Sequence, residues 1–123
     1  MHCSILDSVD QLLLENWKVQ LRKGVLEFSV LNALLARPLY GYDIVKRLSA
    51  INGLTIPEGT IYPILSRFTR DKLVETKIEE SNEGPPRKYY RLSRDGEQLL
   101  EKMNQYWKTL KSGVDSLLKE TTP

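Results

Sequence analysis

Apolar residues recur along this chain at helical spacing in several segments, and in one short segment they alternate with charged residues. Near the N-terminus they follow one another mostly at intervals of three and four: Ile5, Leu6, Val9, Leu12, Leu13 and Trp17. This spacing predicts an amphipathic helix within residues 1–22. Residues 25–36 are densely apolar and indicate a central buried helix. Gly24 lies between the two segments, and we expect it to break or bend the path.

The helical pattern continues on both sides of a short turn in the middle of the chain. Residues 40–51 keep the helical period, and Asn52-Gly53 is a stop signal. Pro57-Glu58 is typical of a first helical turn, which predicts a second helix to about residue 72. Two helices in this order, the second rich in hydroxyl and basic groups, match a helix-turn-helix.

A β-hairpin is predicted directly after this motif. Val74, Thr76 and Ile78 alternate with charged residues, which is typical of a half-buried strand over residues 74–80. Residues 81–86 are rich in turn formers, and residues 87–92 form the expected return strand. Because two strands alone are only marginally stable, the hairpin must pack on the helices.

The last segment predicts a long helix that begins after Ser93. Ser93 is a suitable N-cap, and Asp95 and Glu97 lie favourably near the N-terminus of this helix. Its apolar surface is too wide for a helix that stands alone in solvent. We therefore expect it to pack against the first helix of its own chain and against a partner chain. The residues predicted for a dimer interface are Leu6, Val9, Leu13, Leu99, Met103, Tyr106, Trp107, Leu110, Val114 and Leu117.

The predicted fold is mainly α with a small β-hairpin (α+β), arranged as a winged helix-turn-helix with an added helix at each end. We divide it into an N-terminal amphipathic helix (1–22), a DNA-binding unit (23–92) and a C-terminal dimerisation helix (93–123). The length of 123 residues fits one domain. No apolar run approaches the ~20 residues of a membrane span.

Composition argues against a catalytic or metal-binding role. The only histidine and the only cysteine are the neighbours His2 and Cys3, and two ligands at a terminus do not make a metal site. We find no glycine-rich phosphate loop and no nucleophile paired with a base, so we expect neither an enzyme nor a cofactor. One cysteine allows no internal disulfide, which favours a cytoplasmic location.

The charge is distributed unevenly. Residues 37–94 hold 11 Lys or Arg against 7 Asp or Glu, whereas the two flanks together hold 7 against 9. The middle is therefore basic although the whole chain carries only +2. A basic centre suits double-stranded DNA, and an ordinary solvated surface is the alternative.

The second helix of the motif has two chemically different sides. Ile61, Ile64, Leu65 and Phe68 share one face and should be core. The candidates for DNA binding on the other side are Thr60, Tyr62, Pro63, Ser66, Arg67 and Arg70. Arginine can contact a base edge or a phosphate, and hydroxyls can donate to phosphates. An interior proline costs ~3 kcal/mol, so we expect the regular helix to begin late, near residue 59 or 60.

The return strand supplies the remaining DNA-binding candidates. Alternation places Arg87 and Arg91 on one face and Lys88 on the other. We predict phosphate or minor-groove contacts for Arg87 and Lys88. The alternative is pairing with Glu75 or Glu79 across the hairpin, and for Arg91 we favour that structural role.

Four motifs in this order resemble the PadR family of bacterial transcriptional regulators. They are QLRKGVLE (20–27), YGYDI (40–44), EGTIYP (58–63) and GPPRKYYRL (84–92). The single long C-terminal helix is similar to that of the short-tailed subfamily. The resemblance implies a homodimeric repressor that binds an inverted repeat, with the C-terminal helix packed on the partner's N-terminal helix.

The resemblance also implies that a small aromatic effector could bind in the dimer. In some short-tailed members a tryptophan of the C-terminal helix lines a central cavity, and Trp107 matches its position. The tentative ligand-binding residues are Trp107, Met103, Leu110 and Trp17, although a tryptophan on such a helix is usually core or interface. A helical protein-protein interaction module without specific DNA binding remains the rival function. DNA binding should weaken steeply with salt, whereas apolar helix pairing should not.

Overall fold

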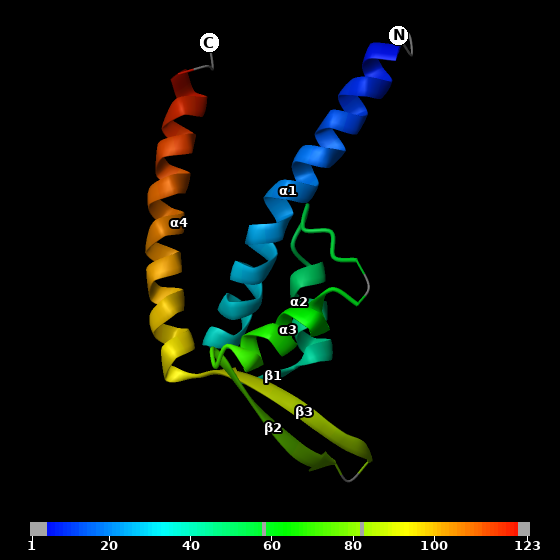
Figure 1. Ribbon diagram of the computed structural model, residues 1–123, viewed down its shortest axis with the longest axis vertical. Helices are drawn as coiled ribbons and strands as arrows, with labels where there is room; N and C mark the ends of the chain where they lie inside the picture. Colours follow the sequence, from blue (N-terminus) through cyan, green and yellow to red (C-terminus); the bar gives the residue numbers. More distant parts are fainter. Residues whose placement is uncertain (1–4, 58, 82, 121–123) are drawn as a thin grey trace.

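The computed structural model describes residues 5–57, 59–81 and 83–120 of the chain. Four helices and a three-stranded antiparallel sheet follow one another along it, as Figure 1 shows. The elements are α1 (Ile5–Leu35), β1 (Leu39–Tyr40), α2 (Gly41–Ser49), α3 (Ile61–Arg70), β2 (Val74–Ser81), β3 (Gly84–Leu92) and α4 (Arg94–Glu120). The predicted mainly α fold with a hairpin after a helix-turn-helix is confirmed.

Helix α1 is one continuous helix of 31 residues, so the expected break at Gly24 is wrong. A glycine inside a helix costs only about 1 kcal/mol relative to alanine. The apolar residues that follow it, among them Leu26 and Val30, are buried in the core and hold the second half of the helix in place. The first half, which carries its own amphipathic pattern, extends the same helix beyond the core (Figure 1).

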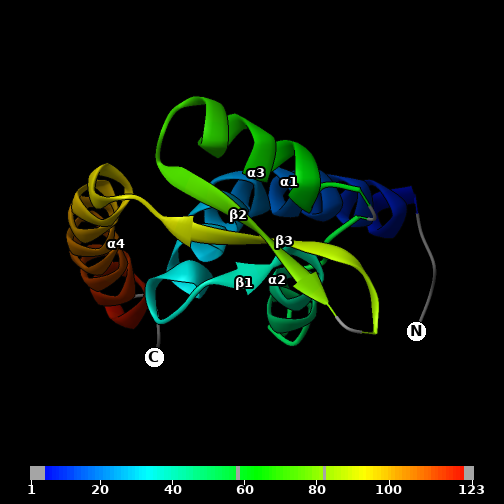
Figure 2. The ribbon, with the colours of Figure 1, turned by 90° about the horizontal axis from the view of Figure 1, so that it is seen from below.

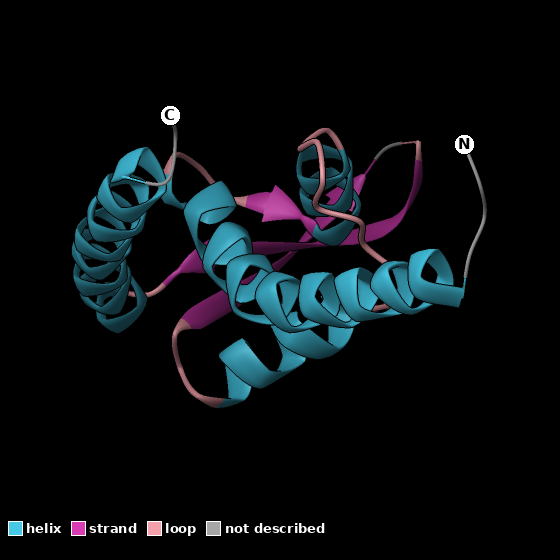
Figure 3. Cartoon of the chain, turned by 90° about the horizontal axis from the view of Figure 1, so that it is seen from above, coloured by secondary structure: helices cyan, strands magenta, loops and turns pink. Residues whose placement is uncertain are grey.

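The hydrophobic core lies where α1, α2, α3, the sheet and the start of α4 meet. Its most deeply buried side chains include Leu31, Ile44, Leu65 and Leu100, one from each of the four helices. Seen from above, α1 runs over the strands with α2 and α3 on either side of it, and α4 stands to one side (Figure 3). The predicted apolar face of the second motif helix is confirmed, because Ile61, Leu65 and Phe68 are buried and Ile64 packs against them.

Helix α3 begins later than the first-turn signal at Pro57 suggests, and a tight backbone turn ends it. Its first residue is Ile61, so Pro63 lies in the first turn, where a missing N–H breaks no helical hydrogen bond. The expected late start is thereby confirmed. At the other end, Lys72 adopts a left-handed φ of 63°, and the N–H of Leu73 donates to the carbonyl of Phe68 at 2.9 Å. This is a Schellman-type ending with lysine where glycine is usual.

The sheet has the strand order β1-β3-β2, with Leu39 opposite Tyr90 and Val74 opposite Leu92. The two-residue strand β1 was not predicted, because so short a segment carries no alternating pattern. Strand β3 begins at Gly84 rather than at Arg87, so the two prolines expected in the loop belong to the strand. The hairpin is therefore longer than predicted, and it extends away from the helices (Figure 1).

Ser93 and Gly96 join the hairpin to α4. The Ser93 hydroxyl donates to the carbonyl of Lys72 at 2.7 Å and accepts from the N–H of Gly96 at 3.0 Å, which confirms Ser93 as the cap. The N–H of Ser93 donates to the carbonyl of Leu73 at 3.0 Å. A β-carbon on Gly96 would overlap that same carbonyl oxygen. Helix α4 therefore starts in direct contact with the turn that ends α3.

Candidate nucleic-acid interface

Four of the predicted DNA-binding residues form the exposed side of α3. Tyr62, Pro63, Ser66 and Arg70 are all exposed, whereas Thr60, immediately before the helix, is half-buried. The guanidinium of Arg70 lies 3.8 Å from the carboxylate of Asp71, a loose surface pair. The view from below shows α3 beside α2 and the sheet on one side of the molecule (Figure 2).

Arg67 points in a different direction from the other candidates. Its guanidinium forms an ion pair with Glu27 of α1, and it lies 5.4 Å from the ring centroid of the buried Phe68. Both charged side chains are about two-fifths exposed. The sequence pattern placed Arg67 on the polar side of the helix, but it could not place Glu27, 40 residues earlier, beside it.

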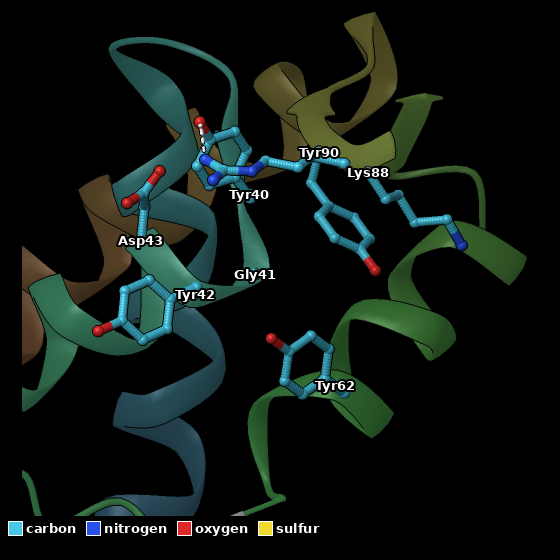
Figure 4. Close-up of a pocket in the computed structure, with 8 residues that line it drawn as sticks. Tyr40, Gly41, Tyr42, Asp43, Tyr62, Lys88 and Tyr90 are labelled. Carbon is cyan, nitrogen blue, oxygen red and sulfur yellow. Dashed lines mark hydrogen bonds between the residues drawn. The ribbon is translucent and has the colours of Figure 1, made fainter. Parts of the chain in front are cut away.

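A groove rich in tyrosine lies between the start of α2, the start of α3 and strand β3. Its volume is about 630 Å³, and its lining residues are Tyr40, Gly41, Tyr42, Asp43, Tyr62, Arg87, Lys88 and Tyr90. Figure 4 shows the rings of Tyr62 and Tyr90 across the groove from one another, with the Tyr62 hydroxyl on the side of Gly41. The ring of Tyr90 is only 8% exposed, and burial, with a smaller contribution from Tyr62, raises its pKa. The Tyr90 hydroxyl therefore keeps its proton at neutral pH and can donate it to an anion.

At one end of this groove Arg87 is held by Tyr40. The guanidinium donates to the Tyr40 hydroxyl at 2.8 Å and lies 4.9 Å from the centre of its ring. Tyr89 stacks beside Tyr40 with ring centroids 4.3 Å apart. Hydrogen bonding between the two hydroxyls raises the pKa of Tyr89 to about 12 and lowers that of Tyr40, which also accepts from Arg87. Because Tyr40 accepts from both neighbours, its own proton can be donated outward.

The other basic residues of β3, Lys88 and Arg91, have different surroundings. The Nζ of Lys88 lies 6.0 Å from the ring of Tyr90, at the groove. Arg91 pairs with Glu75 directly across the hairpin, at 2.9 Å, which confirms the structural role favoured for it. Glu79 faces Arg87 in the strand register, but the Arg87 guanidinium donates to the Tyr40 hydroxyl.

A second, apolar groove of about 650 Å³ lies between α1 and α4. Trp107, Met103 and Leu110 line it together with Val25 and Phe28 of α1. The rings of Phe28 and Trp107 have centroids 5.6 Å apart. Three of the four tentative ligand-binding residues are thus brought together. Trp17, the fourth, lies further along α1, is 61% exposed and is not part of this lining.

Beyond this groove the two long helices separate and extend past the rest of the molecule (Figure 1). Apolar side chains are exposed along both helices, including most of those predicted for a dimer interface: Val9, Leu13, Leu99, Tyr106, Trp107, Leu110, Val114 and Leu117. Met103 is half-buried against the core, and the side chain of Leu6 lies outside the described residues. In the part of the chain that the structure describes, neither long helix has the uniform apolarity of a membrane span.

Sequence reasoning missed three residues of the tyrosine groove and one partner of α3. The sequence pattern predicts no site role for Tyr40, Tyr42, Tyr90 or Glu27. Tyr40, Tyr90 and Glu27 approach residues of other elements, so spacing along one helix or strand could not reveal them. The usable signal was compositional, because five tyrosines fall in positions 40–90 around a basic hairpin.

Comparison with known proteins agrees with this architecture. The model of the transcriptional regulator PadR-like family matches residues 30–102, which is more than half of the chain. The chain belongs to the PadR-like family of transcriptional regulators. The matched segment begins in α1 and ends in α4, so it contains the complete helix-turn-helix, the hairpin and the tyrosine groove.

Solved structures of PadR-like proteins have the same fold. A PadR-like transcription factor from Bacteroides fragilis is 40% identical, with 83% of this chain and 98% of that chain covered and a TM-score of 0.68. A PadR family regulator from Eggerthella lenta is 32% identical over 94% of this chain and 99% of that one, with a TM-score of 0.78. A PadR-like regulator from Bacillus cereus is 36% identical over 80% and 96%, with a TM-score of 0.73.

Membership in this PadR-like family makes the protein a DNA-binding transcriptional regulator rather than an enzyme, as predicted. The fold is the winged helix-turn-helix of these relatives, in which the β2–β3 hairpin is the wing.

Proposed function

We propose that this PadR-like protein is a homodimeric repressor that binds an inverted-repeat operator in double-stranded DNA. The observation that supports this most strongly is the continuity between the exposed side of α3 and the basic, tyrosine-rich groove beside it. Tyr62 belongs to both, since it is exposed on α3 and lines the groove. One protomer therefore offers base-reading and phosphate-binding groups on a single surface.

In the proposed complex, α3 enters the major groove with Pro63, Ser66 and Arg70 toward the bases. These three residues lie near the middle of its exposed side, opposite the buried Leu65. Arg70 is the residue with the reach and the donors to recognise guanine. Thr60 precedes the first turn, where the free N–H groups of a helix suit a phosphate.

The tyrosine groove would receive a phosphate of the DNA backbone. Tyr40, Tyr62 and Tyr90 present hydroxyl donors there, Arg87 and Lys88 supply two positive charges, and the first N–H groups of α2 have no partner within that helix. Asp43 also lines the groove and opposes an anion. The two basic side chains outweigh its single charge, so the groove as a whole still favours a phosphate.

The homodimer is proposed from the uncovered apolar sides of α1 and α4. Monomeric proteins rarely expose such continuous apolar surface, and most soluble oligomers are twofold dimers. In a twofold dimer α4 would cover the first half of the partner's α1. The two recognition helices would then face half-sites related by the same axis, about one helical turn or a multiple apart.

The proposed dimer would repress transcription by occupying its operator. Within the described residues, the elements belong to the DNA-binding unit or to the proposed dimer surface. Contact with chromosomal DNA would require the protein to act in the cytoplasm. A small planar aromatic effector could enter the apolar groove beside Trp107, and it would relieve repression only by favouring one dimer arrangement over another.

Fluorescence anisotropy with DNA from upstream of the gene tests this proposal. Labelled upstream DNA and a scrambled duplex are titrated with the protein across a salt series. The proposal predicts binding that prefers the upstream sequence and weakens steeply as salt rises. Weak binding without preference to any upstream fragment, or apolar binding that salt does not affect, would contradict it.

A further inference from the structure

Arg67 and Glu27 form the one ion pair between α1 and α3 among the described residues. The two positions are 40 residues apart in sequence, so the pair is a tertiary contact and not a local one. The guanidinium also lies on the ring of the buried Phe68, with 5.4 Å to its centroid. Two contacts therefore hold Arg67 toward the body of the protein.

The position of Arg67 on α3 separates it from the surface proposed for DNA. Tyr62 marks the side of the helix that faces α2 and β3. Five residues later, and therefore roughly 140° around the helix axis, Arg67 marks the side that faces α1. The exposed residues Ser66 and Arg70 lie between these two flanks.

We propose that Glu27 and Arg67 are a positioning pair that sets the orientation of the recognition helix, and that Arg67 does not contact DNA. This inference rests on the proposed DNA-binding function. It replaces the sequence-based expectation that Arg67 reads a base or a phosphate. Arg67 acts through Glu27, and the pair ties the second half of α3 to α1 while Tyr62 at the first half packs beside Gly41 of α2.

The partner of Arg67 sits at a junction on α1. Phe28, the next residue after Glu27, contacts Trp107 of α4 and lines the apolar groove. Because α1 is a single continuous helix through Glu27 and Phe28, a rotation or shift of α1 that repacks Trp107 would also move the carboxylate that holds Arg67. The pair therefore links α1, which lines the α1–α4 groove, directly to the recognition helix.

Single substitutions of Glu27 give opposite results under the two roles of Arg67. Glu27→Arg releases Arg67 and adds positive charge on its side of α3. If Arg67 contacted DNA, this change would leave affinity unchanged or raise it. If the pair positions α3, affinity for the upstream DNA falls about threefold or more despite the added charge. Glu27→Gln is the milder variant and should change the DNA affinity in the same direction. The sign of the affinity change can therefore be measured even if Glu27→Arg folds poorly.

The charge exchange Glu27→Arg with Arg67→Glu is the decisive variant. It preserves the net charge and the combined length of the two side chains while reversing the pair. A positioning pair predicts recovery to within about threefold of the original affinity, with an unchanged dependence on salt. A direct phosphate contact predicts no recovery, because a glutamate at position 67 would face DNA, and a salt slope smaller by about 0.9.

A matched exchange elsewhere controls for the manipulation itself. Lys111 and Asp115 form a 2.7 Å pair on α4, on the part that rises away from the wing (Figure 1). Lys111→Asp with Asp115→Lys should leave DNA binding unchanged. Thermal melting confirms that each variant is folded at the assay temperature. If the unmodified protein shows no salt-sensitive binding, the proposed function fails; if it binds and the charge exchange at 27 and 67 does not restore affinity, only the positioning role fails.

Discussion

The first residue of α2, Gly41, lies directly against the ring of Tyr62 at the start of α3. A β-carbon on residue 41 would stand 2.5 Å from Cε1 of Tyr62 and 3.0 Å from its hydroxyl oxygen. The backbone of α2 and the tyrosine of α3 can approach this closely only because residue 41 has no side chain. The contact fixes Tyr62 at the floor of the tyrosine groove, facing Tyr90 (Figure 4).

Gly41→Ala should therefore weaken DNA binding more than it weakens the fold. The added methyl group displaces the Tyr62 ring, which can swing outward, so the free energy of unfolding should change by less than about 1 kcal/mol. We expect affinity for the upstream DNA to fall about tenfold, the loss of one or two hydrogen bonds to a phosphate. Anisotropy titration and urea unfolding of the same preparation measure the two effects.

The matched control is Gly113→Ala. Gly113 lies in α4 with no atom within 4 Å of an added β-carbon, so this change should leave DNA binding intact. It should raise the free energy of unfolding by up to about 1 kcal/mol through helix propensity. Equal loss of DNA affinity in both variants would argue against a specific role for the contact between Gly41 and Tyr62.

Gly96→Ala should destabilise the fold strongly. The new β-carbon would overlap the carbonyl oxygen of Leu73, which is backbone and cannot rotate away. Because the N–H of Ser93 also bonds to that carbonyl, the cap of α4 must shift with it. We expect a loss of about 2–3 kcal/mol in the free energy of unfolding, after the gain in helix propensity. A denaturation midpoint equal to or above that of the unmodified protein would show that the junction tolerates a side chain.

Lys72→Gly should stabilise the protein. Lys72 holds a φ of 63°, a conformation that costs an L-residue about 1–2 kcal/mol and glycine almost nothing. Glycine also loses more freedom on folding, so the net gain should be about 0.5–1 kcal/mol. Urea unfolding measures the change, and Lys77→Gly, in the extended strand β2, is the opposite control and should destabilise. A decrease in stability for Lys72→Gly would mean that the lysine side chain contributes more than its backbone strain costs.

Leu13→Glu or Leu117→Glu should dissociate the proposed dimer. The two side chains are 60% and 61% exposed in the protomer, on the separated parts of α1 and α4. Burying a carboxylate in an apolar interface costs several kcal/mol, so the dissociation constant should rise by at least about a hundredfold. Sedimentation velocity over a concentration series detects the change.

Ile78→Glu serves as the control for this interface. Ile78 is 66% exposed, as apolar as Leu13, but lies on strand β2 of the wing. The substitution Ile78→Glu should leave the sedimentation coefficient of the protein unchanged. A protein that is monomeric before any substitution, or a dimer that Leu13→Glu and Leu117→Glu leave intact, would contradict the assignment of α1 and α4 as the dimer surface.

The sequence sufficed for the elements whose stability is local or periodic. The helical spacing of α2, α3 and α4, the strand β2 and the Ser93 cap all appear in the structure because each depends on neighbouring residues. The half-buried face expected of β2 is wrong beyond Val74, because Thr76 and Ile78 are exposed on a hairpin that extends away from the helices. Gly24 misled the prediction, since its intrinsic cost is small beside the burial of Leu26 and Val30 in the same helix.

The candidate site was harder to predict than the fold. Its residues were drawn from α3 and the wing, where periodicity identifies an exposed face. The groove depends instead on how α2, α3 and β3 approach one another, which brought in Tyr40 and Tyr90. The contact of Arg67 with Glu27 depends on the packing of α1 on α3. Tertiary contacts of this kind leave no repeating pattern in one sequence.

The salt dependence of DNA binding by Lys88→Ala tests the central claim most directly. Lys88 lines the tyrosine groove on the wing, whereas Lys119, in the last turn of α4, is the matched lysine far from it. If the groove receives a backbone phosphate, Lys88→Ala should weaken binding to the upstream duplex and to the scrambled duplex by the same factor. Its slope of log affinity against log salt should be smaller by about 0.9, while Lys119→Ala keeps the original slope. Equal slopes for both variants would contradict a DNA-binding surface built from the wing and the groove.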